Sequence, residues 1–308
     1  MTSELISGLV IRMQAGFFTV KTEDRLLLCQ LRGRIKQNRK LEDLVAIGDQ
    51  VIVSALNEKE GVIEDIQPRE HALVRMAPTT RGDYKQILVA NADQAVFVFS
   101  CTDPDPSLRM LDRFLVIAEK QQITPIIVAN KVDLMNQMDA EQIFSNYTDI
   151  GYPVLYTSAN GRVGIELLRE QLQGKISAFA GPSGVGKTSL LNALRPGLGL
   201  EVRTLKKSSQ KGRHTTTVRQ LFPLDEDSYV ADLPGIRQLS IWDVEPEELD
   251  GYFCEFRSSV EKCQFSNCSH DQEPQCGIKA AVENGEISQA RYDSYLRLRE
   301  ELETSHLY

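Results

Sequence analysis

The sequence lacks the features that would place a protein in a membrane or direct it out of the cell. No apolar run approaches the roughly 20 residues that a membrane-spanning helix requires. The first residues, Met1 to Glu4, do not begin the charged and then apolar pattern of a secretory leader. We therefore expect a cytoplasmic protein with no membrane partner.

The chain also lacks an excess of positive charge. Its 35 Lys and Arg residues are outnumbered by 43 Asp and Glu residues, which gives a formal net charge of −8. This balance argues against binding of nucleic acid through the overall charge, but it does not exclude binding through local basic patches. The chain has six cysteines, and in a cytosolic protein we expect these to serve a metal site or a core rather than disulfides.

At 308 residues the chain is long for a single hydrophobic core, so we expect two or three domains. We place their limits at residues 1–75, 76–240 and 241–308. The first domain contains five short β segments separated by turn residues, which favours a small barrel, with the OB-fold as the leading candidate. Residues 76–92 have little apolar content and are predicted to form a linker.

A cluster of positive charge lies in one predicted loop of the first domain. Its members are Arg32, Arg34, Lys36, Arg39 and Lys40. Such a loop is either simply solvated or, in a small barrel, a place for contacts with an RNA backbone. The charges alone do not decide between these interpretations.

Strand-like and helix-like segments alternate between residue 95 and the start of the third domain. Buried apolar runs such as residues 95–100 are followed by helical patterns such as the one that begins at Leu108. This alternation predicts a parallel sheet covered by helices on both faces. Ligands of such sheets bind at the carboxyl ends of the strands.

A phosphate-binding pattern, G-x-x-x-x-G-K-[ST], lies between a predicted strand and a predicted helix. The glycines allow backbone N–H groups to surround phosphate oxygens, and the helix N-terminus adds partial positive charge. Lys187 would reach the β- and γ-phosphates and assist catalysis, and the Thr188 hydroxyl would bind Mg²⁺. The residues predicted to bind nucleotide here are Gly181, Pro182, Ser183, Gly184, Val185, Gly186, Lys187, Thr188 and Ser189.

Two further motifs at predicted strand ends indicate that the nucleotide is GTP. The carboxylate of Asp133 can accept hydrogen bonds from N1–H and the exocyclic amine of guanine, a donor pair that adenine does not present. Asn130 and Lys131 would brace the base and the neighbouring loop. Ser158 and Ala159 follow the next strand, where backbone amides can reach the guanine oxygen.

The remaining elements of a GTPase follow the phosphate loop. Residues 203–217 have no apolar periodicity and are predicted to form a mobile loop. Within it Thr216, with Thr215 as the alternative, would complete the Mg²⁺ shell when γ-phosphate is present. Asp232 would hold Mg²⁺ through water, and the Gly235 amide would sense the γ-phosphate. Because the base motifs precede the phosphate motifs, which is the reverse of Ras, the domain is predicted to be circularly permuted.

A cluster of metal-ligand residue types lies in the third domain, amid turn residues. Its members are Cys263, Cys268, His270 and Cys276. Three thiols and one imidazole match a tetrahedral Zn²⁺ site with no open position, so we interpret it as structural. The spacings are not the commonest ones of zinc sites, and coincident core cysteines are the alternative. The rest of the domain is predicted to be helical.

This combination of barrel, permuted GTPase and Cys3His lobe resembles the ribosome-small-subunit-dependent GTPase A family of bacteria, over essentially the whole chain. The resemblance implies that the OB-fold and the zinc lobe grip the small (30S) ribosomal subunit and its rRNA. It also implies subunit-stimulated GTP hydrolysis and a role in late subunit maturation. One departure is Leu233, where the family more usually has threonine. We expect a monomer.

The residue that positions the hydrolytic water is a separate question. Ras-like enzymes use a glutamine after the Asp-x-x-Gly motif, and here that position is Ile236, which cannot hydrogen-bond. His214 is our candidate, since a neutral imidazole can accept a hydrogen bond from water; a contact with RNA is its alternative role. Two other functions stay open: a GTP-gated RNA-binding module with incidental hydrolysis, and a P-loop ATPase or kinase, which Asp133 argues against.

Overall fold

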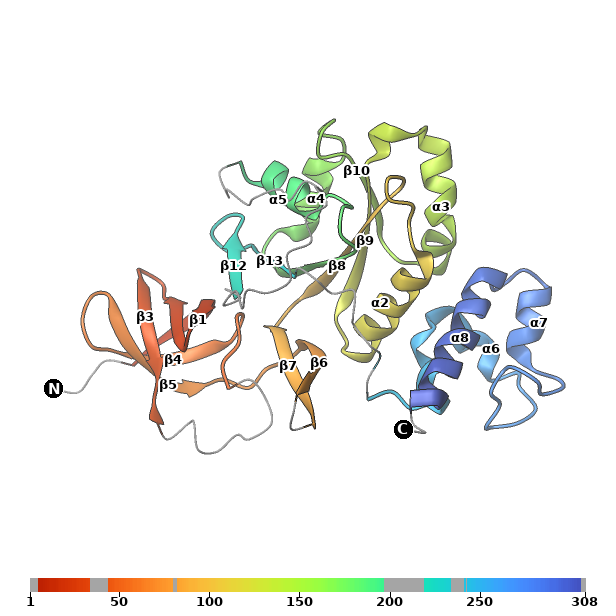
Figure 1. The fold of residues 1–308 in the computed structure, drawn as a ribbon, viewed down its shortest axis with the longest axis horizontal. Coiled ribbons are helices and arrows are strands. Elements are labelled where there is room, and N and C mark those ends of the chain that lie inside the picture. Colours follow the sequence, from red (N-terminus) through yellow and green to blue (C-terminus); the bar gives the residue numbers. More distant parts are fainter. Residues whose placement is uncertain are drawn as a thin grey trace.

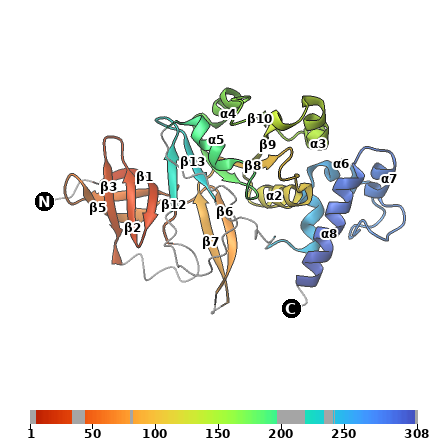
Figure 2. The ribbon, with the colours of Figure 1, turned by 45° about the horizontal axis from the view of Figure 1, so that its top comes forward.

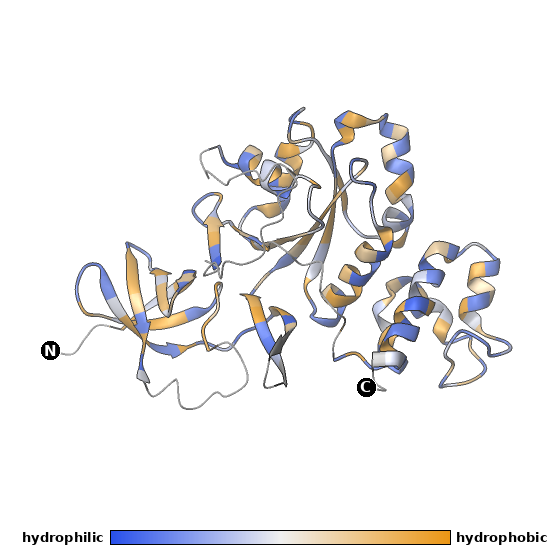
Figure 3. Cartoon of the chain, in the orientation of Figure 1, coloured by the Kyte–Doolittle hydropathy of each residue, from blue (hydrophilic) through white to orange (hydrophobic). Residues whose placement is uncertain are grey.

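The computed structural model describes residues 5–33, 44–79, 82–196, 219–233, 241 and 243–305. A β-barrel, an α/β unit and a helical lobe follow one another along the long axis of the molecule (Figures 1 and 2). Apolar residues are frequent along the central strands and are interspersed with polar ones on the outer helices (Figure 3). Among the described helices, none combines the length and the apolar character needed to cross a membrane.

Five strands form the barrel: β1 (Leu5–Gln14), β2 (Phe17–Lys21), β3 (Leu26–Leu31), β4 (Gln50–Ala55) and β5 (Glu60–Ile66). Their order is β1-β2-β3-β5-β4, and β4 pairs back with β1, which closes the sheet. Alternate side chains point inward, so that Val20, Leu27 and Val53 are fully buried in the barrel core. The predicted five-stranded barrel is confirmed.

A two-stranded ribbon, β6 (Ala72–Thr79) and β7 (Gly82–Ala90), connects the barrel to the α/β unit. The linker predicted over residues 76–92 is therefore wrong. The buried residues of the ribbon lie at its base, where Leu73 is paired with Val89. The apolar run over residues 87–90 lies in β7, but the polar residues before it masked the strand, which becomes evident only when β6 and β7 pair.

The α/β unit is built on six strands: β8 (Gln94–Ser100), β9 (Thr124–Asn130), β10 (Val154–Thr157), β11 (Ile176–Ala180), β12 (Arg219–Pro223) and β13 (Tyr229–Asp232). Their order is β10-β9-β8-β11-β13-β12, and only β12 runs antiparallel to its neighbours. β12 also pairs with β1, so the sheet continues into the barrel.

Helices cover both faces of this sheet, as the sequence predicted. The alternate residues of β8 show the two cores: Phe97 and Phe99 belong to one, Val96 and Val98 to the other. The first core is covered by α2 (Leu108–Lys120) and α3 (Gln137–Ile150), and the second by α4 (Ile165–Leu172) and α5 (Lys187–Leu194). A single 3-10 turn, η1 (Val132–Leu134), follows β9.

The C-terminal lobe consists of η3 (Pro246–Tyr252), η4 (Cys254–Phe256), α6 (Arg257–Val260), α7 (Gly277–Glu283) and α8 (Gln289–Ser305). Phe253, Phe256 and Tyr295 are fully buried at its centre. Val116 of α2 belongs to the same cluster. The lobe is therefore packed directly against one helix of the α/β unit.

A buried ionic network joins the lobe to α2. The guanidinium of Arg291 donates to Asp112 of α2 at 2.6 Å and to Glu255 of η4 at 2.7 Å. Its side chain is only 2% exposed and lies over the ring of Phe253. The Tyr147 hydroxyl of α3 donates to Asp112 at 2.8 Å. Both carboxylates thus depend on one cation that comes from the last helix.

We expect Arg291→Met to destabilise the protein by about 3–5 kcal/mol, because two buried carboxylates would lose their counter-charge. Arg113→Met is the matched control: it removes the ion pair of Arg113 with Glu301 on the exposed rim of the same contact, which should cost about 1 kcal/mol or less. Denaturant unfolding of both variants measures the difference. Equal losses would contradict the importance assigned to the buried network.

Candidate nucleotide site and metal centre

The phosphate loop connects the carboxyl end of β11 to the N-terminus of α5. Gly181, Gly184 and Gly186 have φ values of 150°, 86° and 94°, which L side chains rarely adopt. A Cβ on Gly181 would lie 2.1 Å from the carbonyl oxygen of Val98 in β8, so the loop and the strand approach too closely for a side chain. These glycines are required by the path of the backbone.

Lys187 begins α5 and folds back over the loop. Its Nζ donates to the carbonyl oxygens of Gly181 and Pro182, at 2.7 Å in both cases. The ammonium is thereby held against the backbone of the loop that is predicted to bind the phosphates. Thr188 and Ser189 occupy the first turn of the same helix. Val185 is buried, and Ser183 is exposed at the outer side of the loop.

Asn130 ties the predicted base motif to the phosphate loop. Its side-chain amide donates to the carbonyl oxygen of Val185 at 2.7 Å, and its Oδ1 accepts from the hydroxyl of Thr157 at 3.1 Å. A Cβ on Gly186 would lie 2.4 Å from the Asn130 Nδ2 atom. The asparagine is 1% exposed. One side chain therefore connects the ends of β9 and β10 to the phosphate loop.

The other residues predicted to recognise the base surround this point. Lys131 has a left-handed backbone conformation, with φ of 67°, and its Nζ donates to the carbonyl oxygen of Asp103. Asp133 is exposed in η1, and its carboxylate makes no hydrogen bond or ion pair with any residue that the structure describes. It is therefore available to a ligand at this edge of the sheet.

The loop after β10 contains the two backbone amides, of Ser158 and Ala159, that are predicted to donate to the guanine oxygen, and their hydrogen bonding differs. The Ser158 N–H already donates to the Val163 carbonyl at 3.0 Å, and the Ser158 hydroxyl accepts from the Gly161 N–H at 2.8 Å. Within the described part of the chain the Ala159 N–H has no such partner. The geometry thus favours the Ala159 amide as the donor to a guanine oxygen.

Asp232 ends β13 on the same edge of the sheet, in register with Phe179 of β11. Its Oδ1 is buried and has no hydrogen-bond partner among the described residues. Burial raises the pKa of this carboxyl group, and the nearby Lys187 ammonium opposes that rise. A buried carboxylate oxygen of this kind, together with the Thr188 hydroxyl, offers the hard oxygen donors that suit Mg²⁺.

The Cys3His residues come together in the C-terminal lobe. The ligand atoms of Cys263, Cys268, His270 and Cys276 all lie within 4.8 Å of one another. His270 Nδ1 faces the sulfurs, at 3.5 Å from Cys263 Sγ and 3.4 Å from Cys276 Sγ. Three sulfurs and one nitrogen around a common centre can hold a metal ion, and this donor set fits Zn²⁺.

A neighbouring carboxylate orients the histidine. With Nδ1 turned toward the cluster, Nε2 carries the proton and donates to Asp250 Oδ2 at 3.2 Å. The Tyr292 hydroxyl donates to the His270 carbonyl oxygen at 2.6 Å, and His270 itself is 1% exposed. Asp250 did not emerge from the sequence, since it lies 20 positions before the histidine without a distinctive local pattern.

Comparison with known proteins identifies the family. The RsgA GTPase family model matches residues 66–242, and the RsgA N-terminal domain model matches residues 7–63. The chain belongs to the RsgA GTPase family. As a member of this family it is a GTP-hydrolysing enzyme, and the expected circularly permuted arrangement of its GTPase unit is confirmed.

Individual relatives of this RsgA-family chain match over nearly their whole length. A Gemmatimonas aurantiaca protein named small ribosomal subunit biogenesis GTPase RsgA is 40% identical, with 96% of this chain and 97% of the relative covered. A Thermotoga maritima protein of the same name is 42% identical, with 96% of each covered.

Two solved structures have the same fold. The crystal structure of YjeQ from Thermotoga maritima matches with a TM-score of 0.79 and 40% identity, covering 97% of this chain and 99% of that one. That of YloQ, described as a circularly permuted GTPase, gives 0.76 and 34%, covering 98% and 96%.

Several predicted functional residues of this RsgA-family chain lie outside the described residues. They are Thr216, its alternative Thr215, His214 and Gly235. The same holds for most of the basic loop of the barrel. Of that loop Arg32 is described, and its guanidinium is paired with Glu64 at 2.8 Å.

We expect Asp133→Asn to lower GTP affinity by about tenfold to a hundredfold and to raise affinity for xanthosine triphosphate, because an amide can donate to the xanthine oxygen but cannot accept both guanine donors. Asp149→Asn, an exposed carboxylate of α3, is the control and should leave both affinities unchanged. Equilibrium binding of fluorescent analogues of both nucleotides measures the effect. An unchanged preference for GTP would contradict the assignment of Asp133.

We expect Asp250→Ala to weaken metal binding by about tenfold to a hundredfold, because the carboxylate fixes the orientation of the His270 ring. Glu283→Ala, at the exposed end of α7, provides a control at a distance from the cluster. Competition with a chromogenic zinc chelator gives both affinities. Equal affinities in the two variants would show that Asp250 does not support the site.

Proposed function

We propose that this GTPase binds the small (30S) ribosomal subunit and acts in its late maturation, and that the subunit stimulates GTP hydrolysis. The observation that carries the proposal is the match along nearly the entire chain to relatives, about 40% identical, that are named small ribosomal subunit biogenesis GTPases. The matched region, 96% of the chain in both cases, includes the barrel and the lobe as well as the nucleotide site.

The proposal assigns roles to particular residues of the nucleotide site. Asp133 and the Ala159 amide, with Asn130, Lys131 and Ser158 as their support, recognise guanine. The loop from Gly181 to Ser189 holds the phosphates, Lys187 assists hydrolysis, and Thr188 and Asp232 hold Mg²⁺. Thr216 and Gly235 respond to the γ-phosphate, and His214 positions the water. The convergence of the described members of this set on one sheet edge supports the assignment.

The remaining parts of the proposal concern cofactors and partners. The metal of the Cys3His cluster is one structural Zn²⁺, supported by a donor set that leaves no open position. The barrel and the lobe contact rRNA, and the protein works as a cytoplasmic monomer. We take residues 1–75, 76–240 and 241–308 as the three domains.

The proposal is tested by measuring GTP hydrolysis with purified small ribosomal subunits, with large subunits, and without subunits. We expect strong stimulation by small subunits alone, because the bound particle would order the hydrolytic residues. Lys187→Ala serves as the control for contaminating hydrolysis and should abolish turnover in every condition. Bound GTP without stimulation by small subunits, together with GTP-dependent RNA affinity, would instead support a GTP-gated RNA-binding module and overturn the proposal.

A further inference from the structure

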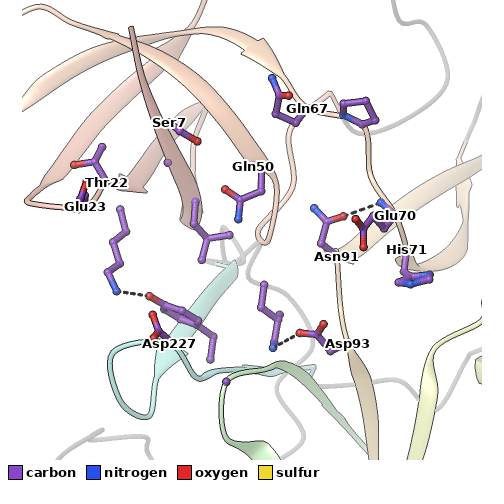
Figure 4. A pocket seen from close by; sticks show the side chains of 17 residues that line it. Ser7, Thr22, Glu23, Gln50, Gln67, Glu70, His71, Asn91, Asp93 and Asp227 are labelled. Carbon is purple, nitrogen blue, oxygen red and sulfur yellow. Dashed lines mark hydrogen bonds between the residues drawn. The ribbon is translucent and has the colours of Figure 1, made fainter. Parts of the chain in front are cut away.

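The barrel and the GTPase sheet meet through a short strand pairing. β1 pairs with β12 through two residue pairs, Arg12 with Gln220 and Met13 with Arg219. Toward the start of β1 the two units separate, and a cavity of about 700 Å³ opens between them. Figure 4 shows this cavity, with Ser7, Thr22 and Gln50 on the barrel side and Asp227 on the opposite side. The joint is thus closed at one end and open at the other.

Arg219 lies at the closed end and contacts two other parts of the molecule. Its backbone is paired with Met13 of the barrel, and its Nη1 donates to the carbonyl oxygen of Ile87 in β7 at 2.8 Å. Arg219 also begins β12, directly after the segment in which the sequence places His214 and Thr216. A shift of the barrel or of the β6–β7 ribbon would therefore displace the start of β12, which follows the predicted γ-phosphate-sensing Thr216 by three positions in the sequence.

A comparable contact at the open end has different neighbours. The Nζ of Lys21 in β2 donates to the Glu226 carbonyl oxygen at 2.7 Å and to the Tyr229 hydroxyl at 2.6 Å. Like Arg219, Lys21 is a cation that joins one unit to a carbonyl oxygen of another. It contacts the β12–β13 turn, however, at the end of β12 that is remote from Arg219. A substitution of Lys21 therefore weakens the contact between the barrel and the GTPase unit without affecting the start of β12. A substitution of Arg219 affects the start of β12 itself.

We propose that Arg219 is a positioning residue for stimulated GTP hydrolysis: its contacts with Met13 and Ile87 set the start of β12 relative to the barrel and the ribbon, so that a particle held by the barrel acts on the hydrolytic site through this residue. The inference rests on the proposed function, which supplies the particle. Arg219 touches neither nucleotide nor metal in this scheme. Its effect depends on small displacements of the hydrolytic groups, to which rates are sensitive.

The test compares GTP hydrolysis at increasing concentrations of small ribosomal subunits in the unchanged protein and in three variants. Arg219→Met should lower the maximal stimulated rate by about tenfold or more, while the subunit concentration for half-maximal stimulation and the affinity for GTP stay unchanged. Arg219→Lys should restore most of the rate, because its ammonium can also donate to the Ile87 carbonyl. Lys21→Met should behave as the unchanged protein.

Each contrary result has a distinct meaning. A normal stimulated rate in Arg219→Met overturns the inference. Equal losses in Arg219→Met and Lys21→Met also overturn it, because the joint as a whole would then be responsible. A higher half-maximal subunit concentration with an unchanged maximal rate would make Arg219 a binding residue instead. Lack of stimulation in the unchanged protein would overturn the proposed function itself, and the wild-type measurement separates that failure from the others.

Discussion

The nucleotide site depends on one buried amide. Asn130 donates to the carbonyl oxygen of Val185 and accepts from Thr157, so it joins the segments that are predicted to recognise the base and the phosphates. Because the amide is almost completely buried, a substitution that left these groups unpaired would cost more free energy than the hydrogen bonds contribute on their own. The glycines of the phosphate loop are part of the same constraint, since only a residue without a Cβ fits beside Asn130 at Gly186.

The circular permutation determines how the GTPase unit is connected to the barrel and to the C-terminal lobe. β12, at the edge of the GTPase sheet, continues into the barrel through β1, and the chain that leaves Asp232 leads toward the C-terminal lobe. The lobe nevertheless takes its position from α2, through Arg291 and Asp112, and not only from its chain connection. The two flanking units are therefore fixed to opposite sides of the GTPase unit by different interactions, one through backbone pairing and the other through buried charge (Figure 1).

The Cys3His cluster and the Arg291 network lie in neighbouring parts of the same small lobe. A lobe of this size has little apolar surface to bury, so paired charge, and a metal ion held by the Cys3His cluster, would compensate for a limited core. His270 connects the cysteine cluster to the aromatic core of the lobe. Its ring faces the cysteines, contacts Phe256 and Tyr295, and is oriented by Asp250 of η3.

The sequence by itself determined the barrel, the covered sheet, the permutation and the four candidate metal ligands, because each depends on local periodicity or on short motifs. It could not reveal the β6–β7 ribbon, the support of His270 by Asp250, or the choice of Ala159 over Ser158 as the free amide. Those features depend on partners distant in the sequence, such as Leu73 with Val89, or on which backbone groups are already hydrogen-bonded. The tertiary structure decided them, because only folding brings Arg219 to Ile87 and Arg291 to Asp112.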